Sequence, residues 1–174
     1  MNISDFRTTS ITMVKREVDF DRLKLLLLEF ASSIDFDLCY QSFLRELSNV
    51  AELYSSPNGV AFILNRDNNT VGCVGLMEVK PGIAMIKRLC IRSDFRRHHF
   101  EKQLLKVAID WAHQKGMRKL RVDPCDTLQG ISKLCIDEGF TEITPCNTLT
   151  TSSLTCLELR LTPKPEFIRQ LAAC

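Results

Sequence analysis

The sequence predicts a mixed α/β protein in which helices cover a central sheet of antiparallel and parallel strands. After one short strand pattern come two helical patterns, then three strand patterns joined by tight turns, and then helices that alternate with strands. Hairpin-linked strands pair antiparallel, whereas strands joined through a helix pair parallel. The order β-α-α-β-β-β-α-β-α-β-β therefore favours one mixed sheet over a doubly wound sheet.

The strands are predicted from short apolar or alternating runs bounded by turn residues. Turns are expected at 66–69, from the Asp and Asn content, and at 80–82, which reads Lys-Pro-Gly. Between them, Gly72 and Gly75 indicate a bulge or a close approach of the backbone. The expected strands are residues 10–17, 60–65, 70–79, 83–91, 117–122, 140–144 and 155–161.

Apolar residues at helical spacing predict two helices before the first hairpin. The first is capped by Asp19 or Asp21 and passes through Phe30. The second runs from Asp37 to about Ser48. Its expected inward side chains are Leu38, Phe43 and Leu44.

Two further helices follow the hairpins. The clearest helical pattern of the chain spans about His98 to Lys115 and stops at Gly116. The other starts at Asp126, has Gln129 at capping-box spacing and stops at Gly139. The apolar face expected for the first of these helices is Phe100, Leu104, Val107, Ala108 and Trp111.

Length and composition are those of an ordinary globular domain. The chain has 174 residues, 45% of them hydrophobic and 25% charged, which excludes disorder, collagen and coiled coil for the whole chain. We expect a single domain over 1–174, with a core at about 11–161 and a short tail at 162–174. The net charge of +2 gives no reason to expect nucleic acid or a membrane as partner.

Eight scattered cysteines lack the spacing of a metal site or a CxxC pair. Several lie inside apolar patterns, where a free thiol behaves as a small hydrophobic side chain. No secretory signal and no apolar run long enough for a bilayer is visible. We therefore predict free thiols, no metal and a reducing, cytoplasmic compartment.

Two stretches of the chain carry a resemblance to a known family. Residues 86–123, IKRLCIRSDFRRHHFEKQLLKVAIDWAHQKGMRKLRVD, look like its strand, pyrophosphate loop, helix and following strand. Residues 134–143, LCIDEGFTEI, look like its LYxxxGFxxx ending. With the element order, they resemble the GCN5-related N-acetyltransferase (GNAT) superfamily over roughly residues 11–161. The resemblance implies an acyl-CoA N-acyltransferase fold.

The resemblance also implies a site for acetyl-CoA. Backbone groups of Leu89, Cys90 and Ile91 would hold the pantetheine arm, and the loop and helix start at 96–101 would hold the pyrophosphate. N–H groups and the dipole at a helix N-terminus favour an anion there. The pyrophosphate residues would be Arg96, Arg97, His98, His99, Phe100 and Glu101.

This chain departs from the family pattern Gln/Arg-x-x-Gly-x-Gly/Ala. Arg96 fits the first position, but His99 and Glu101 stand at the glycine positions, where glycine lets phosphate approach the backbone. The Glu101 carboxylate also repels a pyrophosphate at the helix N-terminus. Arg97, His98 and His99 either attract the phosphates or form a solvated loop.

The catalytic positions of the family differ as well. Met85 stands where many relatives carry a glutamate base, and it cannot accept a proton. Cys135 stands where a tyrosine commonly protonates the leaving thiolate, and a thiol can donate a proton, but a buried helix thiol is the simpler interpretation. Asp123 and Glu78 are alternative candidates for the base, against ordinary roles as a loop carboxylate and a solvent-facing strand residue.

Two functions follow from the resemblance. One is acetyl transfer from acetyl-CoA to a primary amine of a small molecule or a protein. The other is a catalytically inactive acetyltransferase-like module with a decayed CoA site, kept for binding or interaction. The acceptor is not identified by the sequence, and a homodimer is left open.

Overall fold

The computed structural model describes residues 8–32, 40–96, 99–122, 131–143 and 156–162. In these residues the strands form a seven-stranded sheet of order β1-β2-β3-β4-β5-β7-β6. β4 and β5 pair parallel, and the other neighbouring strands pair antiparallel. The mixed sheet that the element order predicts is therefore confirmed. The strands are β1 Thr9–Met13, β2 Gly59–Arg66, β3 Asn69–Lys80, β4 Ile83–Ile91, β5 Lys119–Val122, β6 Thr141–Ile143 and β7 Cys156–Arg160.

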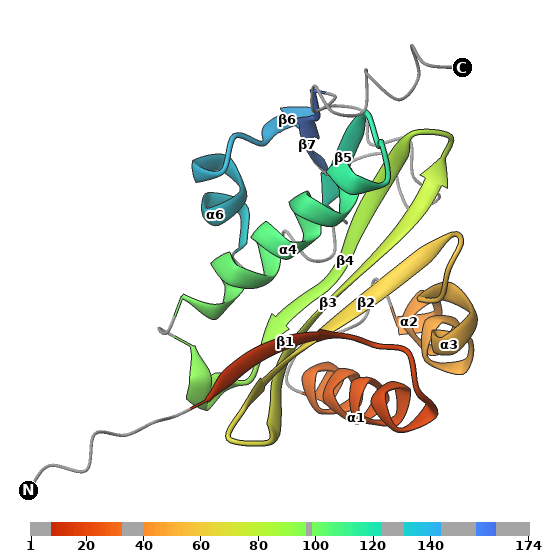
Figure 1. Cartoon of the computed structure of the whole chain (residues 1–174), viewed down its shortest axis with the longest axis vertical. Helices are drawn as coiled ribbons and strands as arrows, with labels where there is room; N and C mark the ends of the chain where they lie inside the picture. Colours follow the sequence, from red (N-terminus) through yellow and green to blue (C-terminus); the bar gives the residue numbers. More distant parts are fainter. Residues whose placement is uncertain (1–7, 33–39, 97–98, 123–130, 144–155, 163–174) are drawn as a thin grey trace, which may run out of the picture.

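Helices cover both faces of the sheet (Figure 1). α1, α2 and α3 lie on one side, whereas α4 lies on the other side with α6 beyond it. α3 and the short 3-10 helix η1 are additions to the predicted order. The helical elements are α1 Glu17–Ser32, α2 Tyr40–Ser48, α3 Val50–Leu53, η1 Ser93–Phe95, α4 Phe100–Gln114 and α6 Ser132–Asp137.

The two faces of the sheet carry separate hydrophobic clusters. The cluster under α4 contains Phe100, Leu104 and Trp111, all buried, so the predicted apolar face of this helix is confirmed. Val107 is only partly buried at its edge. The cluster under α1–α3 is formed by α1 and α2 against alternate residues of β2, β3 and β4, and it includes Cys73 and Cys90. The sheet is thus buried on both sides at β3 and β4.

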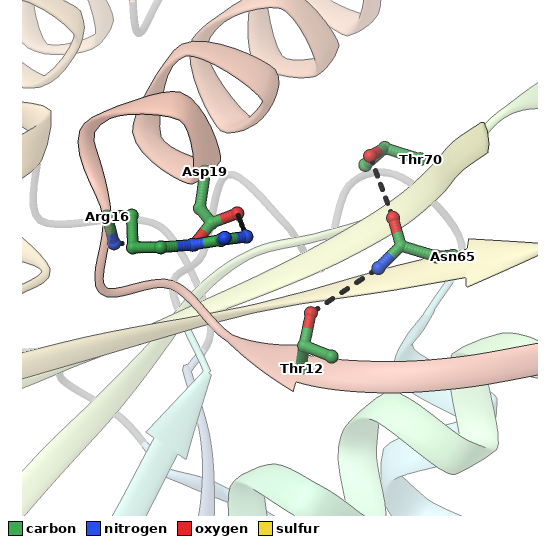
Figure 2. A network of polar contacts seen from close by, with 5 residues as sticks. All are labelled: Thr12, Arg16, Asp19, Asn65 and Thr70. Carbon is green, nitrogen blue, oxygen red and sulfur yellow. Dashed lines mark hydrogen bonds and ion pairs between the residues drawn. The ribbon is translucent and has the colours of Figure 1, made fainter. Parts of the chain in front are cut away.

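The start of α1 differs from its prediction. β1 ends at Met13 rather than at 17, and Asp19 lies in the first helical turn instead of at the cap. Its carboxylate accepts hydrogen bonds from the Arg16 backbone N–H at 3.3 Å and from the Arg16 guanidinium at 3.0 Å (Figure 2). A carboxylate that reaches back to the residue before the helix is one half of a capping box.

α2 begins at Tyr40, and the predicted start at Asp37 and the inward Leu38 lie outside the described residues. Phe43 is buried as expected, but Leu44 is 43% exposed, so its inward placement was wrong. The inward position one turn after Phe43 belongs to Glu46, a charged residue that hydrophobic periodicity does not select.

The β2–β3 hairpin confirms its predicted turn. Asp67 and Asn68 both have positive φ, of 50° and 65°, as a two-residue type I′ turn requires. At the turn end of this hairpin, Asn65 donates a hydrogen bond to Thr12 of β1 and accepts one from Thr70 of β3 (Figure 2). These bonds tie three strands together beside the register shift between Leu64 and Asn65.

The later boundaries agree with prediction within a few residues. β4 spans Ile83–Ile91 as predicted, and Gly116 and Gly139 end α4 and α6 with φ of 69° and 94°. The predicted helix start at Asp126 with Gln129 lies outside the described residues, as does the tail beyond 162.

Candidate functional site

The parallel pairing of β4 with β5 covers only part of β4. Ile83–Ile86 pair with Lys119–Val122, while β4 continues to Ile91 on the side of β3 alone in the described residues. Within the described residues, one edge of β4 at 87–91 therefore has no β5 neighbour. We call this edge the opening.

The amides along this edge are those of Leu89 and Ile91. Arg92 donates its N–H to the Val71 carbonyl of β3 at 2.8 Å. Successive N–H groups of a strand point to opposite edges, so the N–H groups of Ile91 and Leu89 point away from β3. The Cys90 amide points toward β3 by the same alternation. Two of the three residues predicted for the pantetheine arm thus present N–H groups to the opening.

A β-bulge in β4 lies directly before these residues. Cys73 pairs with Cys90 and Gly75 with Lys87, so three steps along β4 match two steps along β3. Arg88, inside the bulge, has a φ of 57°. The bulge or close approach expected at Gly72 and Gly75 is thus found where the register shifts between Cys73 and Gly75. The sequence does not mark Arg88 itself, because the residue in the left-handed conformation is not a glycine.

Arg88 is also the centre of a buried polar cluster. Its Nε and Nη2 donate to the two carboxylate oxygens of Glu46 in α2, at 2.9 and 2.8 Å. Tyr54, just after α3, donates its hydroxyl to the same Glu46 Oε1. The guanidinium lies 5.0 Å from the centre of the Phe43 ring. Sequence reasoning missed Glu46, Tyr54 and Arg88, because the contact joins residues 42 positions apart.

The N-terminus of α4 lies after the opening along the chain. His99 is its N-cap with a φ of 56°, a conformation that glycine adopts without cost, and it makes no side-chain capping bond. Phe100 is buried in the core, so only its backbone can face an anion. Glu101 is partly exposed in the first turn. The backbone N–H groups at this end of a 15-residue helix can bind an anion, whereas the negative charge of the Glu101 carboxylate repels one.

The other predicted phosphate residues are placed only in part. Arg96 is exposed and ends η1, where its N–H donates to the Ser93 carbonyl. Arg97 and His98 lie outside the described residues. In the first turn of α4, Lys102 forms an ion pair of 2.8 Å with Glu138, the residue after α6. The hydrogen bond from Lys102 holds the pKa of Glu138 below its ordinary value.

Of the candidate catalytic residues in the described part of the chain, Cys135 and Glu78 lie in different elements and do not form one site. Cys135 is fully buried in the cluster under α4 and is not in a disulfide, and Asp123 lies outside the described residues. Glu78 accepts a hydrogen bond of 2.8 Å from the Gly82 N–H and so closes the β3–β4 turn. Met85 is buried on β4.

A charged cluster lies beside Met85 on the same face of the sheet. Arg121 of β5 is the register partner of both Met85 and Glu158. Glu158, 4% exposed, pairs with Lys119 and Arg121 at 2.9 Å each. Burial raises the pKa of Glu158, but the hydrogen bonds and charges of the two cations outweigh it, and the pKa lies below its ordinary value. This carboxylate therefore stays ionised near neutral pH.

One cysteine prediction was wrong. Cys156 is disulfide-bonded, whereas Cys73, Cys90 and Cys135 are free thiols as expected. Scattered spacing did not reveal this, because a disulfide depends on distance in the folded chain. Within the described ranges no three His, Cys, Asp or Glu side chains are grouped to hold a metal, and no helix has the length and apolar content to span a bilayer.

Comparison with known proteins points to one family. The acetyltransferase (GNAT) family model matches residues 26–129. An uncharacterized N-acetyltransferase of Schizosaccharomyces pombe is 30% identical over 138 residues, which cover 78% of this chain and 85% of that protein.

Solved structures agree in fold. A GNAT-family acetyltransferase from Staphylococcus aureus Mu50 has a TM-score of 0.69 at 17% identity, over 88% of this chain and 100% of the other. The PaiA N-acetyltransferase of Thermoplasma acidophilum, solved in complex with coenzyme A, has a TM-score of 0.60 at 16% identity, over 87% and 99% of the two chains.

Proposed function

This chain belongs to the acetyltransferase (GNAT) family, and we propose that it transfers the acetyl group of acetyl-CoA to a primary amine. The observation that carries the proposal is the open edge of β4 beyond Ile86, followed along the chain by the uncapped N-terminus of α4. The coenzyme A bound in the Thermoplasma structure supports the choice of cofactor. The acceptor is an amine of a small molecule or of a protein.

The residues that would hold acetyl-CoA are those of the opening. N–H groups of Leu89 and Ile91 would bind the pantetheine arm and polarise the thioester carbonyl, an oxyanion-hole type of stabilisation. The backbone at His99, Phe100 and Glu101 would bind the pyrophosphate, with Arg96, Arg97 and His98 nearby in sequence. The thioester supplies an activated acyl group that an amine can attack directly.

The carboxylates described near β4 already accept hydrogen bonds or form ion pairs with other groups. Glu46 accepts three hydrogen bonds, Glu78 is bonded to Gly82, and Glu158 is held by two cations. We propose that water removes the proton, with Asp123 as the alternative base. Cys135 stays the candidate acid for the thiolate, although its full burial favours a structural thiol.

An inactive binding module is the second candidate function. Glu101 in the first turn of α4 and Met85 on β4 are the observations that favour it, since one repels phosphate and the other cannot accept a proton. Three further predictions remain predictions: a cytoplasmic location, a homodimer, and the absence of nucleic-acid and membrane partners. The disulfide at Cys156 weakens the argument for a reducing compartment.

Binding of CoA separates the two candidates. At 100 times its Kd, CoA stabilises the protein by about 2.7 kcal/mol, which raises the Tm of a chain this long by roughly 5–10 °C. Ile91→Pro removes one N–H that faces the opening without removing a bond to β3, so it should weaken CoA binding, whereas Ile91→Val should not.

Catalysis is then measured as thiol release from acetyl-CoA with an alkyl diamine, an α-amino acid and a lysine peptide. Release with any of these amines supports the enzyme. No thermal shift at millimolar CoA would support the inactive module instead.

A further inference from the structure

We propose that Arg88, held by Glu46 and Tyr54, is a positioning residue for acetyl transfer. It would fix the bulge of β4 so that Leu89 and Ile91 present their N–H groups to acetyl-CoA. The inference rests on the proposed function and deepens it. It assigns a role to the buried cluster of Arg88, Glu46 and Tyr54, and that role requires no contact with the cofactor or the acceptor.

The backbone conformation of Arg88 is the first support. A φ of 57° inside a strand is unfavourable for a residue with a side chain, and an arginine is kept there only when its surroundings determine the conformation. Such residues gather at functional sites, and bulges re-aim strands next to active sites. Arg88 combines both features directly before the two amides of the opening.

Burial of the charges is the second support. Arg88 is 3% exposed and Glu46 is 4% exposed, so both charges have lost their hydration. A buried ion pair is often no more stabilising than apolar residues of the same volume, because desolvation offsets the attraction. Stability alone therefore does not account for the pair, whereas a requirement for one defined backbone geometry does.

The contacts around Arg88 leave it little freedom. Both carboxylate oxygens of Glu46 accept hydrogen bonds from the Arg88 guanidinium, and the ring of Phe43, in the same helix, packs against the guanidinium. Tyr54 fixes Glu46 in turn. The Cys73 thiol lies 3.3 Å from the Arg88 carbonyl and donates to it. Side chain and backbone of the bulge residue are thus held from α2, from the residue after α3, and from β3.

The extra residue decides which amides face the opening. If β4 lost its bulge, every residue on one side of it would shift by one position relative to β3. The N–H groups of Leu89 and Ile91 would then turn toward β3, and their side chains would leave the core under α4. Fixing the bulge therefore fixes the donors that the proposed reaction uses.

The test removes both charges together. In Glu46→Leu/Arg88→Met no buried charge is left unpaired, so the variant is expected to fold. We expect hydrogen exchange of the peptide over 86–92 to rise at least tenfold, with exchange of 104–114 in α4 unchanged. The Kd for acetyl-CoA should rise and the kcat of thiol release should fall, each by about tenfold or more. If the cluster only stabilised the fold, the variant would lower the folded fraction and leave Kd and kcat of the folded protein unchanged.

A second variant keeps the inference testable if the double variant does not fold. Tyr54→Phe removes one hydroxyl and leaves the ion pair. Like the double variant, it should raise hydrogen exchange over 86–92 and lower kcat, but each by a smaller factor. Where the double variant does fold, adding Tyr54→Phe to it should change neither the exchange over 86–92 nor kcat further, because the Glu46 acceptor is already gone. Wild-type exchange over 86–92 together with wild-type kcat and Kd in a folded variant would overturn the positioning role.

The proposed function can fail separately. If the wild-type protein binds no acetyl-CoA, both the function and the positioning role are overturned, even if exchange shows that the cluster fixes β4. If wild type and variants bind and react alike, only the positioning role is overturned.

Discussion

Gly75 of β3 lies against the ring of Tyr54, so closely that a Cβ at position 75 would stand 2.4 Å from Tyr54 Cε1. No real Cβ contact is that short, so alanine at this position must displace the buried ring. We expect Gly75→Ala to lower the free energy of unfolding by about 1–3 kcal/mol, as overpacking of a core does. Urea denaturation measures it.

The control for Gly75→Ala is a double-mutant cycle with Tyr54→Leu. Leucine lacks the outer ring atoms that clash, so the cost of Gly75→Ala should become much smaller in that background. An equal cost in both backgrounds would show that the loss comes from the strand backbone and not from the ring.

The Glu158 cluster predicts a pH dependence of stability. Because the folded-state pKa of Glu158 lies below its ordinary value, its contribution is fully present above the ordinary carboxyl pKa and is lost as the pH falls through the folded pKa. Glu158→Gln should lower the free energy of unfolding by about 1–3 kcal/mol at neutral pH, because two cations lose a charged partner. Its deficit against wild type should shrink as the pH falls from 5 toward 3.

Urea denaturation at several pH values measures this deficit. Glu142→Gln, at an exposed position of β6, is the matched control and should leave the pH dependence as in wild type. A deficit for Glu158→Gln that stays constant from pH 7 to 3 would contradict the ion-pair explanation.

The first turn of α4 predicts how CoA binding responds to charge. Glu101→Gly should tighten CoA binding by about 1–2 kcal/mol, roughly 5–30-fold, and less at high salt. Glu101→Gln removes the charge and keeps the bulk, so it should reproduce the salt-dependent part of the gain. Calorimetric titration at two salt concentrations measures both. Low-micromolar binding by wild type that Glu101→Gly leaves unchanged would mean that the side chain points away from the phosphates.

We expect Glu101→Gly to lower the stability of the protein and His99→Gly not to lower it. The sequence places both in the first helical turn, where glycine costs up to about 1 kcal/mol. The structure places His99 at the N-cap with positive φ, so glycine relieves an unfavourable conformation there and should not destabilise the protein. Thermal denaturation of the two single variants distinguishes these positions.

The cysteines predict a labelling pattern. Alkylation of the denatured, unreduced protein should label Cys73, Cys90 and Cys135 and leave Cys156 unlabelled. After reduction all eight cysteines of the chain should be labelled. Mass spectrometry of the digested protein reads out each site, and labelling of Cys156 without reductant would contradict the disulfide.

Local patterns predicted most elements because local forces decide them. Ile83–Ile91 is an apolar run between a Pro-Gly turn and a polar loop, and the structure has the same bounds. The buried face of α4 follows from helical spacing alone. Asp19 was assigned to the cap because Asp is a common capping residue, whereas its bonds to Arg16 place it in the first turn.

The assignment of Leu89 and Ile91 to the cofactor stays a prediction from the family resemblance. In the structure these residues lie on the part of β4 beyond its pairing with β5. Cys135 lies in a buried cluster and Glu78 accepts a hydrogen bond in a turn, and a catalytic role for either stays a prediction. Gly72 and Gly75 marked the neighbourhood of the bulge, but not Arg88 on the other strand, which is an ordinary strand residue by sequence.

The sequence by itself determined the order of elements, the mixed sheet and the apolar faces, since these depend on the periodicity of neighbouring residues. Only the tertiary structure decided that Glu46 and Arg88 meet, that Tyr54 closes the pair and that β4 carries an extra residue between Lys87 and Leu89. Those contacts join α2 to β4 across 42 positions. A buried charge becomes favourable only when its partner is already in place, and that condition belongs to the packed protein rather than to any segment of it.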